Sequence, residues 1–349
     1  MPPINIVLHF LLAFLLQQTT NAFTVTGKTS SRRYDGGFVT TLKSTAFEND
    51  TNNDIAATRN DASTNSDDNL QSILRDVVKP PPELQNLNVG ETFDIPGTPV
   101  EIVRVASKPD MYVVRNLIPM EDRQDLISHE HDFESAETKS GFTSHRSNSR
   151  VSWVYSEDET KPIARFLERF CVHEFLHPTL LAQYRRYAPE PLQIANYELG
   201  GKFDIHHDGG GRVVTVLSYL NGVAGTWFPF AKVHHDVNEG DEGPPQMTLN
   251  NKMTEGMEPG RDGIWVVGNE GTGGSGIDDT ISHTYHESKN PHIVRVEPGD
   301  AIVFYNYEYD EEFQGPLMCW RSLHAGMPAK QEKWIVTNWI DCEYLIKKR

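Results

Sequence analysis

The sequence predicts a mainly β fold with flanking helices, an α+β arrangement whose core is a sandwich or a jelly roll. From residue 193 onward the chain has many short runs of β-branched and aromatic residues separated by Gly, Pro and Asn. No helical period separates these runs, which argues against the alternating strands and helices of a parallel sheet. The helical patterns lie earlier, at residues 120–131 and 162–176, so the helices are expected to flank a core made of strands.

Strands are expected where these runs occur, and the two helices where the 3.6-residue period occurs. Pro162 stands at the first turn of the second helix, where its missing N–H costs nothing. The expected strands are residues 100–107, 111–118, 193–205, 212–220 and 225–233, two strands within 293–306, and a strand ending the segment 322–340.

Composition limits the classes of partner. The chain has 349 residues, with 49 acidic against 32 basic side chains and a formal net charge of -17. Such an acidic surface does not neutralise phosphates, so no nucleic-acid partner is expected. Three cysteines are too few for a disulfide framework or a Cys-based zinc site, and they allow at most one disulfide.

The first residues have the pattern of a secretory signal. An apolar run of 13 residues at 4–16 is followed by Thr20 and Ala22, small residues that suit signal cleavage. Such a run is too short to span a bilayer comfortably. We therefore expect a signal peptide at 1–22 and no stable membrane span after its cleavage.

Residues 23–75 are expected to be disordered, because they are rich in Ser, Thr, Asn and Asp and poor in large apolar groups. Within them, residues 23–47 carry four basic side chains and one acid, which is transit-peptide composition. The endoplasmic reticulum lumen of the secretory pathway is the preferred destination, and the plastid, reached through a bipartite signal, is the alternative. The folded domain is expected at 76–349.

A metallopeptidase motif occurs in the second predicted helix and is set aside. His173 to His177 spells HExxH, in which two histidines one helical turn apart bind zinc. Pro178 follows directly and disfavours helical geometry at His177. The helix is therefore expected to end there.

The tripeptide His-His-Asp occurs at 206–208 and again at 234–236. The first copy ends a strand-like run, so His206 and Asp208 are expected on one face of the strand while His207 points away. With His324 as a third ligand, the set becomes two histidines and one carboxylate, the arrangement of non-haem iron oxygenases. The second copy runs into an acidic Gly/Pro segment and has no matching distal partner.

The sequence resembles the prolyl 4-hydroxylase family of iron(II)- and 2-oxoglutarate-dependent dioxygenases. The resemblance runs from residue 111 to 340 and is strongest in "NYELGGKFDIHHD", in "RVVTVLSYLN" with "GTWFPF", and in "PGDAIVFYN" followed by "SLHAGMPAKQEKW". It implies a double-stranded β-helix, or jelly-roll, core. It also implies that His206, Asp208 and His324 are the catalytic metal ligands.

The resemblance assigns further roles residue by residue. Lys333 matches the base that pairs with the far carboxylate of 2-oxoglutarate, and Lys330 is the fallback because the spacing from His324 is one residue shorter than usual. Tyr197 and Thr337 match residues that line the 2-oxoglutarate pocket. The substrate-side positions are Arg212, Trp339 and Arg146.

The implied activity is hydroxylation of peptidyl proline at C4, as in procollagen-proline 4-dioxygenases, with conversion of 2-oxoglutarate and O2 to succinate and CO2. Iron(II), 2-oxoglutarate and ascorbate are the implied cofactors, and a proline-containing peptide or protein is the implied substrate. Phe203 stands where the family commonly has Tyr, and Asp341 where it has a basic or imidazole side chain. These departures keep open the same chemistry on another residue or small molecule. A non-catalytic jelly-roll binding module is a further alternative, against which the intact triad counts.

An insertion is expected at about 231–290, because the metal ligands Asp208 and His324 are 324 minus 208, or 116, positions apart. Its Gly, Pro and acidic residues are typical of a long loop, and the preferred interpretation is a lid over the substrate groove. A second metal site on its histidines, His234, His235, His283 and His286, is the less favoured interpretation.

Overall fold

One long strand, β6 (Leu192–His206), belongs to both layers of the fold. Its first part pairs with β15 (Lys333–Asp341), and its second part pairs with β14 (His324–Gly326). The computed structural model describes residues 71–129, 131–136, 146–155, 162–180, 190–234, 252–268 and 292–342, all within one compact unit.

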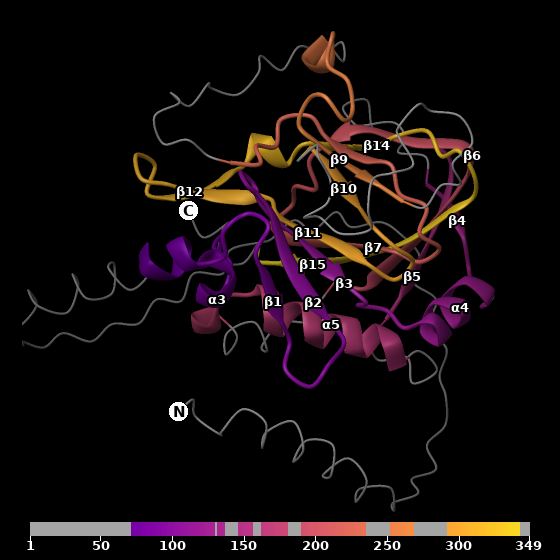
Figure 1. The fold of residues 1–349 in the computed structure, drawn as a ribbon, viewed down its shortest axis with the longest axis horizontal. Coiled ribbons are helices and arrows are strands. Elements are labelled where there is room, and N and C mark those ends of the chain that lie inside the picture. Colours follow the sequence, from indigo (N-terminus) through magenta and orange to yellow (C-terminus); the bar gives the residue numbers. More distant parts are fainter. Residues whose placement is uncertain are drawn as a thin grey trace, which may run out of the picture. The chain divides into compact units, whose positions relative to one another are not determined.

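The strands form one curled sheet in the order β1-β2-β3-β11-β7-β15-β6-β14-β8-β9-β10, with β5 along β6 and β4 along β5. All pairings are antiparallel except that of β9 with β10. In Figure 1 the strands β9, β10 and β14 lie together, apart from β2, β3 and β11. The bounds are β1 Thr92–Asp94, β2 Glu101–Ser107, β3 Asp110–Arg115, β4 Glu134–Ser135, β5 Arg146–Val154, β7 Arg212–Tyr219, β8 Thr226–Phe228, β9 Ile264–Val267, β10 Ile293–Arg295 and β11 Ala301–Tyr305.

A separate hairpin and a few helices complete the described residues. The hairpin pairs β12 (Tyr307–Asp310) with β13 (Gly315–Met318). The helices are α3 (Pro82–Gln85), α4 (Met120–Ser128) and α5 (Pro162–Phe175), with 3-10 turns at Lys252–Thr254 and Trp320–Ser322. None of the helices that the structure describes is long and apolar enough to cross a membrane.

Two apolar cores lie on the two faces of the layer of strands that contains β15, β7 and β11. Residues that pair across strands share a face, so Thr337, Leu217 and Ile302 form one row across β15, β7 and β11. This row faces Phe228 and Ile264 of β8 and β9, and the space between is the inner core. The alternate residues of the same strands face outward to the second core, which α5 covers. The predicted mainly β, jelly-roll fold is confirmed.

Helix α5 covers the outer core with one stripe of side chains. Ile163, Leu167, Cys171 and Phe175 recur four residues apart and are at most 5% exposed. The helix ends at Phe175, as Pro178 predicts, so His177 lies outside it. The HExxH geometry is therefore not formed, and this finding removes the metallopeptidase alternative.

The folded domain begins earlier than the predicted boundary at residue 76. Residues 71–76 are helical, and Leu74 is 4% exposed in the described structure. This helix is short and gives a weak signal in sequence, because packing against distant residues supplies most of the stability of a short helix. The three cysteines are buried and free, and they form no disulfide.

The predicted insertion at 231–290 contains a strand, β9, that was not expected there. Ile264 and Val266 are fully buried, and β9 pairs with β8 and β10 as part of the sheet. A four-residue strand beside Gly263 and Gly268 is hidden by the surrounding loop composition. Residues 235–251 and 269–291, with most of the proposed lid and with His235, His283 and His286, lie outside the described residues.

Other strands were missed or differ in length. The segment expected as a strand at 225–233 is a strand only over Thr226–Phe228, because Pro229 cannot donate to the ladder. Strand β5, which includes Arg146, and the β12–β13 hairpin were not predicted as strands. Their alternation of apolar and polar residues is weak, which removes the usual sequence signal.

The core position of β9 can be tested by stability. Ile264→Ala should lower the free energy of unfolding by about 2–5 kcal/mol, because it removes buried methyl groups and leaves a cavity. Urea unfolding of the two proteins measures the difference. Glu255→Ala, at an exposed position in the same region, is the control and should have little effect. A small effect of Ile264→Ala would show that this segment contributes little to the stability of the core.

Candidate metal centre and pocket

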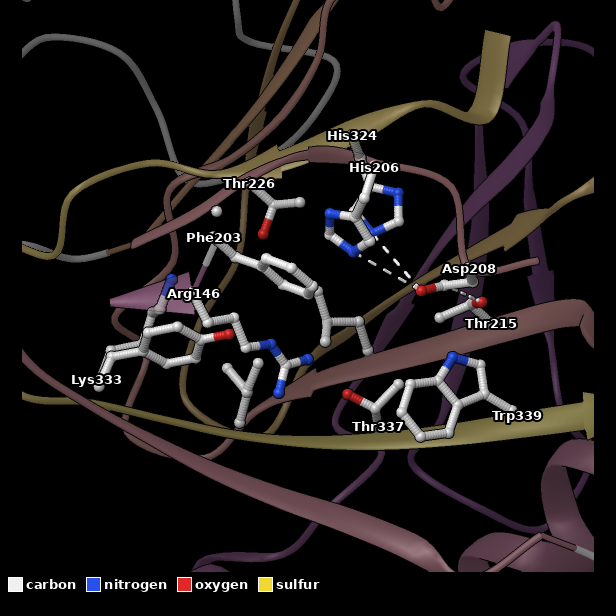
Figure 2. A pocket seen from close by; sticks show the side chains of 14 residues that line it. Arg146, Phe203, His206, Asp208, Thr215, Thr226, His324, Lys333, Thr337 and Trp339 are labelled. Carbon is white, nitrogen blue, oxygen red and sulfur yellow. Dashed lines mark hydrogen bonds and ion pairs between the residues drawn. The ribbon is translucent and has the colours of Figure 1, made fainter. Parts of the chain in front are cut away.

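Antiparallel pairing places two histidines side by side. His206 is the last residue of β6, His324 is the first of β14, and the two are direct cross-strand partners. Their rings lie 4.2 Å apart between centroids. Asp208 follows two residues after the end of β6, and Figure 2 shows its carboxylate facing both rings.

The three side chains have the geometry of a metal site. The Nε2 atoms of His206 and His324 lie 3.7 Å and 4.0 Å from Oδ1 of Asp208. One candidate ligand atom from each residue falls within 4.8 Å of the others, and the side chains are 7–12% exposed. Two imidazoles and one carboxylate on one side of an ion suit a divalent first-row metal and leave coordination positions open. The residues therefore fit iron(II).

Backbone carbonyls fix which nitrogen of each ring faces the site. Nδ1 of His206 donates to the carbonyl oxygen of Asp204 at 2.9 Å, and Nδ1 of His324 donates to that of Ser322 at 3.0 Å. A carbonyl can only accept, so the proton sits on Nδ1 in both rings. The lone pair of each Nε2 is left to bind a metal.

The protonation states also suit metal binding. Burial, and then the neighbouring His324 ring, lower the pKa of His206 to about 3. Burial raises the pKa of Asp208, but the His324 and His206 rings and the Thr215 hydroxyl outweigh it and bring that pKa to about 2. A neutral imidazole and an ionised carboxylate are the forms that bind a metal ion near neutral pH.

Aromatic rings enclose the two histidines. The Phe203 ring stacks on His206 with a centroid distance of 3.6 Å. Phe228 and Phe304 pack against His324 at 5.3 Å and 4.9 Å. These contacts hold the imidazoles in place and exclude water from their faces.

The triad opens into a pocket that has a buried lysine in its wall. Lys333 lines the pocket, is 2% exposed, and has its Nζ 4.5 Å from the centre of the Tyr197 ring. Lys330, the other candidate, is exposed on the segment before β15. A metal triad and a buried cation in one pocket fit a molecule that chelates through one end and carries a carboxylate at the other. Of the two candidate lysines, Lys333 is therefore the one in the wall of the pocket that contains the triad.

The other predicted residues divide between the pocket and its edge. Tyr197, Thr337, Trp339 and Arg146 line the pocket. Arg146 lies inside it, with its guanidinium 4.1 Å over the Phe203 ring (Figure 2). Its Nη1 donates to Oε1 of Gln193 at 3.0 Å.

Arg212 is not among the pocket-lining residues. Its guanidinium stacks on the Trp339 ring at 3.8 Å. It also forms a two-point ion pair with Glu190, with Nε 2.9 Å from Oε2. Glu190 thus neutralises the charge of Arg212, which the resemblance implies is a substrate-side residue.

The pocket also contains residues to which no role was assigned. Thr226 is 3% exposed, and its Oγ1 accepts a hydrogen bond from the Tyr219 hydroxyl at 2.9 Å. Thr215 lies beside Asp208. Each is a threonine in a mostly apolar, buried strand, and that pattern could have marked both as candidate pocket residues. Phe203, Leu217, Gly326 and Ile335 complete the unassigned lining.

The second His-His-Asp has no counterpart to this geometry among the described residues. His234 is exposed and joins no metal-binding group in the described part of the chain. His235 and Asp236 lie outside the described residues. The observed triad thus uses the first copy.

Comparison with known proteins agrees with this chemistry. The model of the 2OG-Fe(II) oxygenase superfamily matches residues 192–341, a segment that contains the triad, Lys333 and Thr337. The match covers 150 of the 349 residues and shows that this segment is similar to 2OG-Fe(II) oxygenases. Iron(II) and 2-oxoglutarate are the cofactors that this similarity and the pocket both indicate.

Two curated relatives of this chain come from Arabidopsis thaliana. Probable prolyl 4-hydroxylase 4 is 27% identical over 165 residues, which are 43% of this chain and 41% of the relative. Probable prolyl 4-hydroxylase 11 is 52% identical over 46 residues, 12% of this chain and 17% of the relative. The matches thus span less than half the length of either relative. Together with the family model they confirm the resemblance to the prolyl 4-hydroxylase family.

Two solved structures are also similar. The viral collagen prolyl hydroxylase of Paramecium Bursaria Chlorella virus-1, in complex with 2OG, is 17% identical with a TM-score of 0.34, covering 66% of this chain and 94% of that one. A prolyl-4-hydroxylase of Pseudomonas putida is 12% identical with a TM-score of 0.33, covering 67% and 94%. Since both TM-scores are below 0.5, the fold assignment rests on the strand pairing described above.

The metal ligands can be tested by metal binding alone. His206→Ala or His324→Ala should weaken Co(II) binding by more than about 100-fold, beyond the range seen when only an outer-shell partner is lost. Titration of metal-free protein, followed by the visible spectrum of Co(II), measures the affinity. His234→Ala is the matched control and should bind as the wild type does. Equal losses for His206→Ala and His234→Ala would contradict the assignment of the triad.

Substituting Lys333 and Lys330 separately tests which lysine pairs with the far carboxylate of 2-oxoglutarate. Lys333→Ala should weaken 2-oxoglutarate binding by about 2 kcal/mol or more, roughly 30-fold, because it leaves a carboxylate unpaired in a buried pocket. Calorimetry with anaerobic, iron-loaded protein gives the affinity. Lys330→Ala should leave that affinity unchanged, and the reverse pattern would assign the role to Lys330.

Proposed function

We propose that the protein is an iron(II)- and 2-oxoglutarate-dependent dioxygenase that hydroxylates peptidyl proline at C4. The observation that carries the proposal is the pocket itself, in which a His206/Asp208/His324 triad and the buried Lys333 line the same cavity. The relatives support proline as the substrate, since they are named prolyl 4-hydroxylases.

Iron with 2-oxoglutarate, when bound, supplies the activation of O2 that converts 2-oxoglutarate to succinate and CO2 and leaves one oxygen atom on the substrate carbon. The residues of this chain hold and orient the reactants. The two Nε2 atoms and Oδ1 of Asp208 would hold the ion, and a set of three protein ligands would leave positions for 2-oxoglutarate and O2. Lys333 pairs with the far carboxylate of 2-oxoglutarate. The Phe203 ring excludes water from one face of His206.

Aromatic side chains beside the pocket support a proline-containing substrate. Trp153 of β5 is 38% exposed, and its ring lies 6.1 Å from that of Trp339, which lines the pocket. Proline-rich segments dock on aromatic surfaces in their extended polyproline conformation. The Trp153 ring offers such a surface, and the buried Trp339 ring connects it to the wall of the pocket.

One observation favours a second substrate class with the same chemistry. Arg146 places a guanidinium inside the pocket, where it can pair with the carboxylate of a free amino acid or another small acid. The departures from the family pattern at Phe203 and Asp341 also favour a substrate other than peptidyl proline. The alternative is therefore oxidation of a small anionic molecule. A non-catalytic binding module is disfavoured by the complete triad.

We also propose that the protein acts in the endoplasmic reticulum lumen and uses ascorbate to keep its iron reduced. The apolar run at residues 4–16, followed by a candidate cleavage site, supports the secretory route. The Ser- and Thr-rich, basic segment at 23–47 supports the plastid as the alternative. Imaging of the full chain with a C-terminal fluorescent tag separates the two.

The proposed activity is tested with pure protein, iron(II), 2-oxoglutarate, ascorbate and a panel of proline-rich peptides. We expect succinate formation coupled to a gain of one oxygen atom on proline, read by mass spectrometry. Asp208→Ala should abolish both signals, because it removes a metal ligand.

Two other outcomes decide between the alternatives. Succinate formation stimulated by small acids but not by peptides would transfer the proposal to the second substrate class. Arg146→Ala should then abolish the stimulation. No turnover of 2-oxoglutarate with any partner, in protein shown to bind metal, would leave only the binding module.

A further inference from the structure

The two oxygens of the Asp208 carboxylate have different partners. Oδ1 faces the two histidine Nε2 atoms at 3.7 Å and 4.0 Å. Oδ2 instead accepts a hydrogen bond from Oγ1 of Thr215 at 2.5 Å (Figure 2). Thr215 lies in β7 and is 1% exposed, so this bond is shielded from water. Only one of the two oxygens is thus directed at the metal position.

A second hydrogen bond fixes the direction of the first. Nδ2 of Asn306 donates to Oγ1 of Thr215 at 2.8 Å. A hydroxyl has one proton and an ionised carboxylate can only accept, so the proton of Thr215 is directed to Asp208. The amide of Asn306 must then present its NH2 group to Thr215. The chain Asn306 to Thr215 to Asp208 therefore has one consistent direction.

Asn306 also holds His207, the residue between the ligands His206 and Asp208. Asn306 lies between β11 and β12 and is fully buried. Its backbone carbonyl oxygen accepts a hydrogen bond from Nε2 of His207 at 2.8 Å. Nδ1 of His207 accepts from the backbone N–H of Gly209 at 2.9 Å. The middle residue of His-His-Asp thus anchors the turn that carries Asp208.

We propose that Thr215 is a positioning residue that keeps Asp208 a one-oxygen ligand of the metal, with Asn306 and His207 holding it in place. A carboxylate can bind a metal ion through one oxygen or through both. With Oδ2 bonded to Thr215, the second oxygen stays off the metal and the coordination position it could take stays open. Partners of ligating carboxylates commonly orient them in this way.

The inference rests on the proposed function only in sharing its metal triad. Its test is metal binding without substrate, so absence of peptide hydroxylation would not affect it. Conversely, its failure would leave the proposed activity untouched.

Thr215→Val tests the hydroxyl, because it removes the donor while keeping the shape of the side chain. Co(II) is titrated into metal-free protein, and the visible spectrum reports both affinity and coordination. We expect a changed Co(II) spectrum and an affinity weakened by about 10–100-fold, the usual range for loss of an outer-shell partner. Thr215→Ser keeps the hydroxyl and should restore the wild-type spectrum.

Two results would overturn the proposal. The first is an unchanged Co(II) spectrum and affinity in Thr215→Val accompanied by a lower unfolding temperature, which is the pattern of a purely structural residue. The second is a Thr215→Ser variant that behaves like Thr215→Val, since the hydroxyl would then not be the cause.

Asn306→Ala tests whether that residue acts through Thr215. Alone it should shift Co(II) binding in the same direction as Thr215→Val. In the Thr215→Val background it should have no further effect on Co(II) affinity, because residues in one hydrogen-bond network are not additive. Additive effects on affinity would show that Asn306 does not act on Asp208 through Thr215. Thermal unfolding of each variant identifies any that fails to fold, and the Thr215 pair then decides the proposal alone.

Discussion

The site depends on the pairing of β14 with β6, which sets His324 directly across from His206. Side chains alternate along a strand, so a slip of one residue would turn His324 to the opposite face and leave two ligands in place of three. Contacts on both sides hold this register. Ala325 pairs with Trp227 of β8, and the rings of Phe228 and Phe304 pack on the His324 imidazole. Two of the three ligands are thus placed by the sheet, and Asp208 by the turn that follows β6.

The same strand also fixes the other end of the pocket. Tyr197 of β6 pairs with Lys333 of β15, and farther along β6 lies His206. The spacing between the buried cation and the metal ligands is therefore set by a length of backbone that is hydrogen-bonded to its neighbours. Sites built on strands of a scaffold hold their geometry more closely than sites built on loops. A molecule that must touch both ends is selected by length as well as by charge.

The pattern of residues predicted much of this arrangement, and the limits have physical causes. His206 and Asp208 were expected on one face because two residues separate them on a strand, and Lys333 was ambiguous because spacing along the chain does not give the direction of a side chain. Strand β9 escaped notice because burial by distant strands, and not its own length, makes it a strand. Asn306 carried no signal, since its partner Thr215 is 91 residues away. Local pattern thus finds ligands more readily than the groups that orient them.

The pairing of β5 has a consequence for how the pocket opens. Within the described part of the chain, β5 pairs with β6 and with the two-residue strand β4, whereas β15 pairs with β6 on one side and with β7 on the other. Amides with fewer protecting neighbours open first in native-state fluctuations, often as one cooperative unit. Arg146 begins β5 and Trp153 lies near its end, so both side chains belong to that unit. Fraying of this edge would withdraw the guanidinium and the indole together, while the metal ligands on β6 and β14 stay in register.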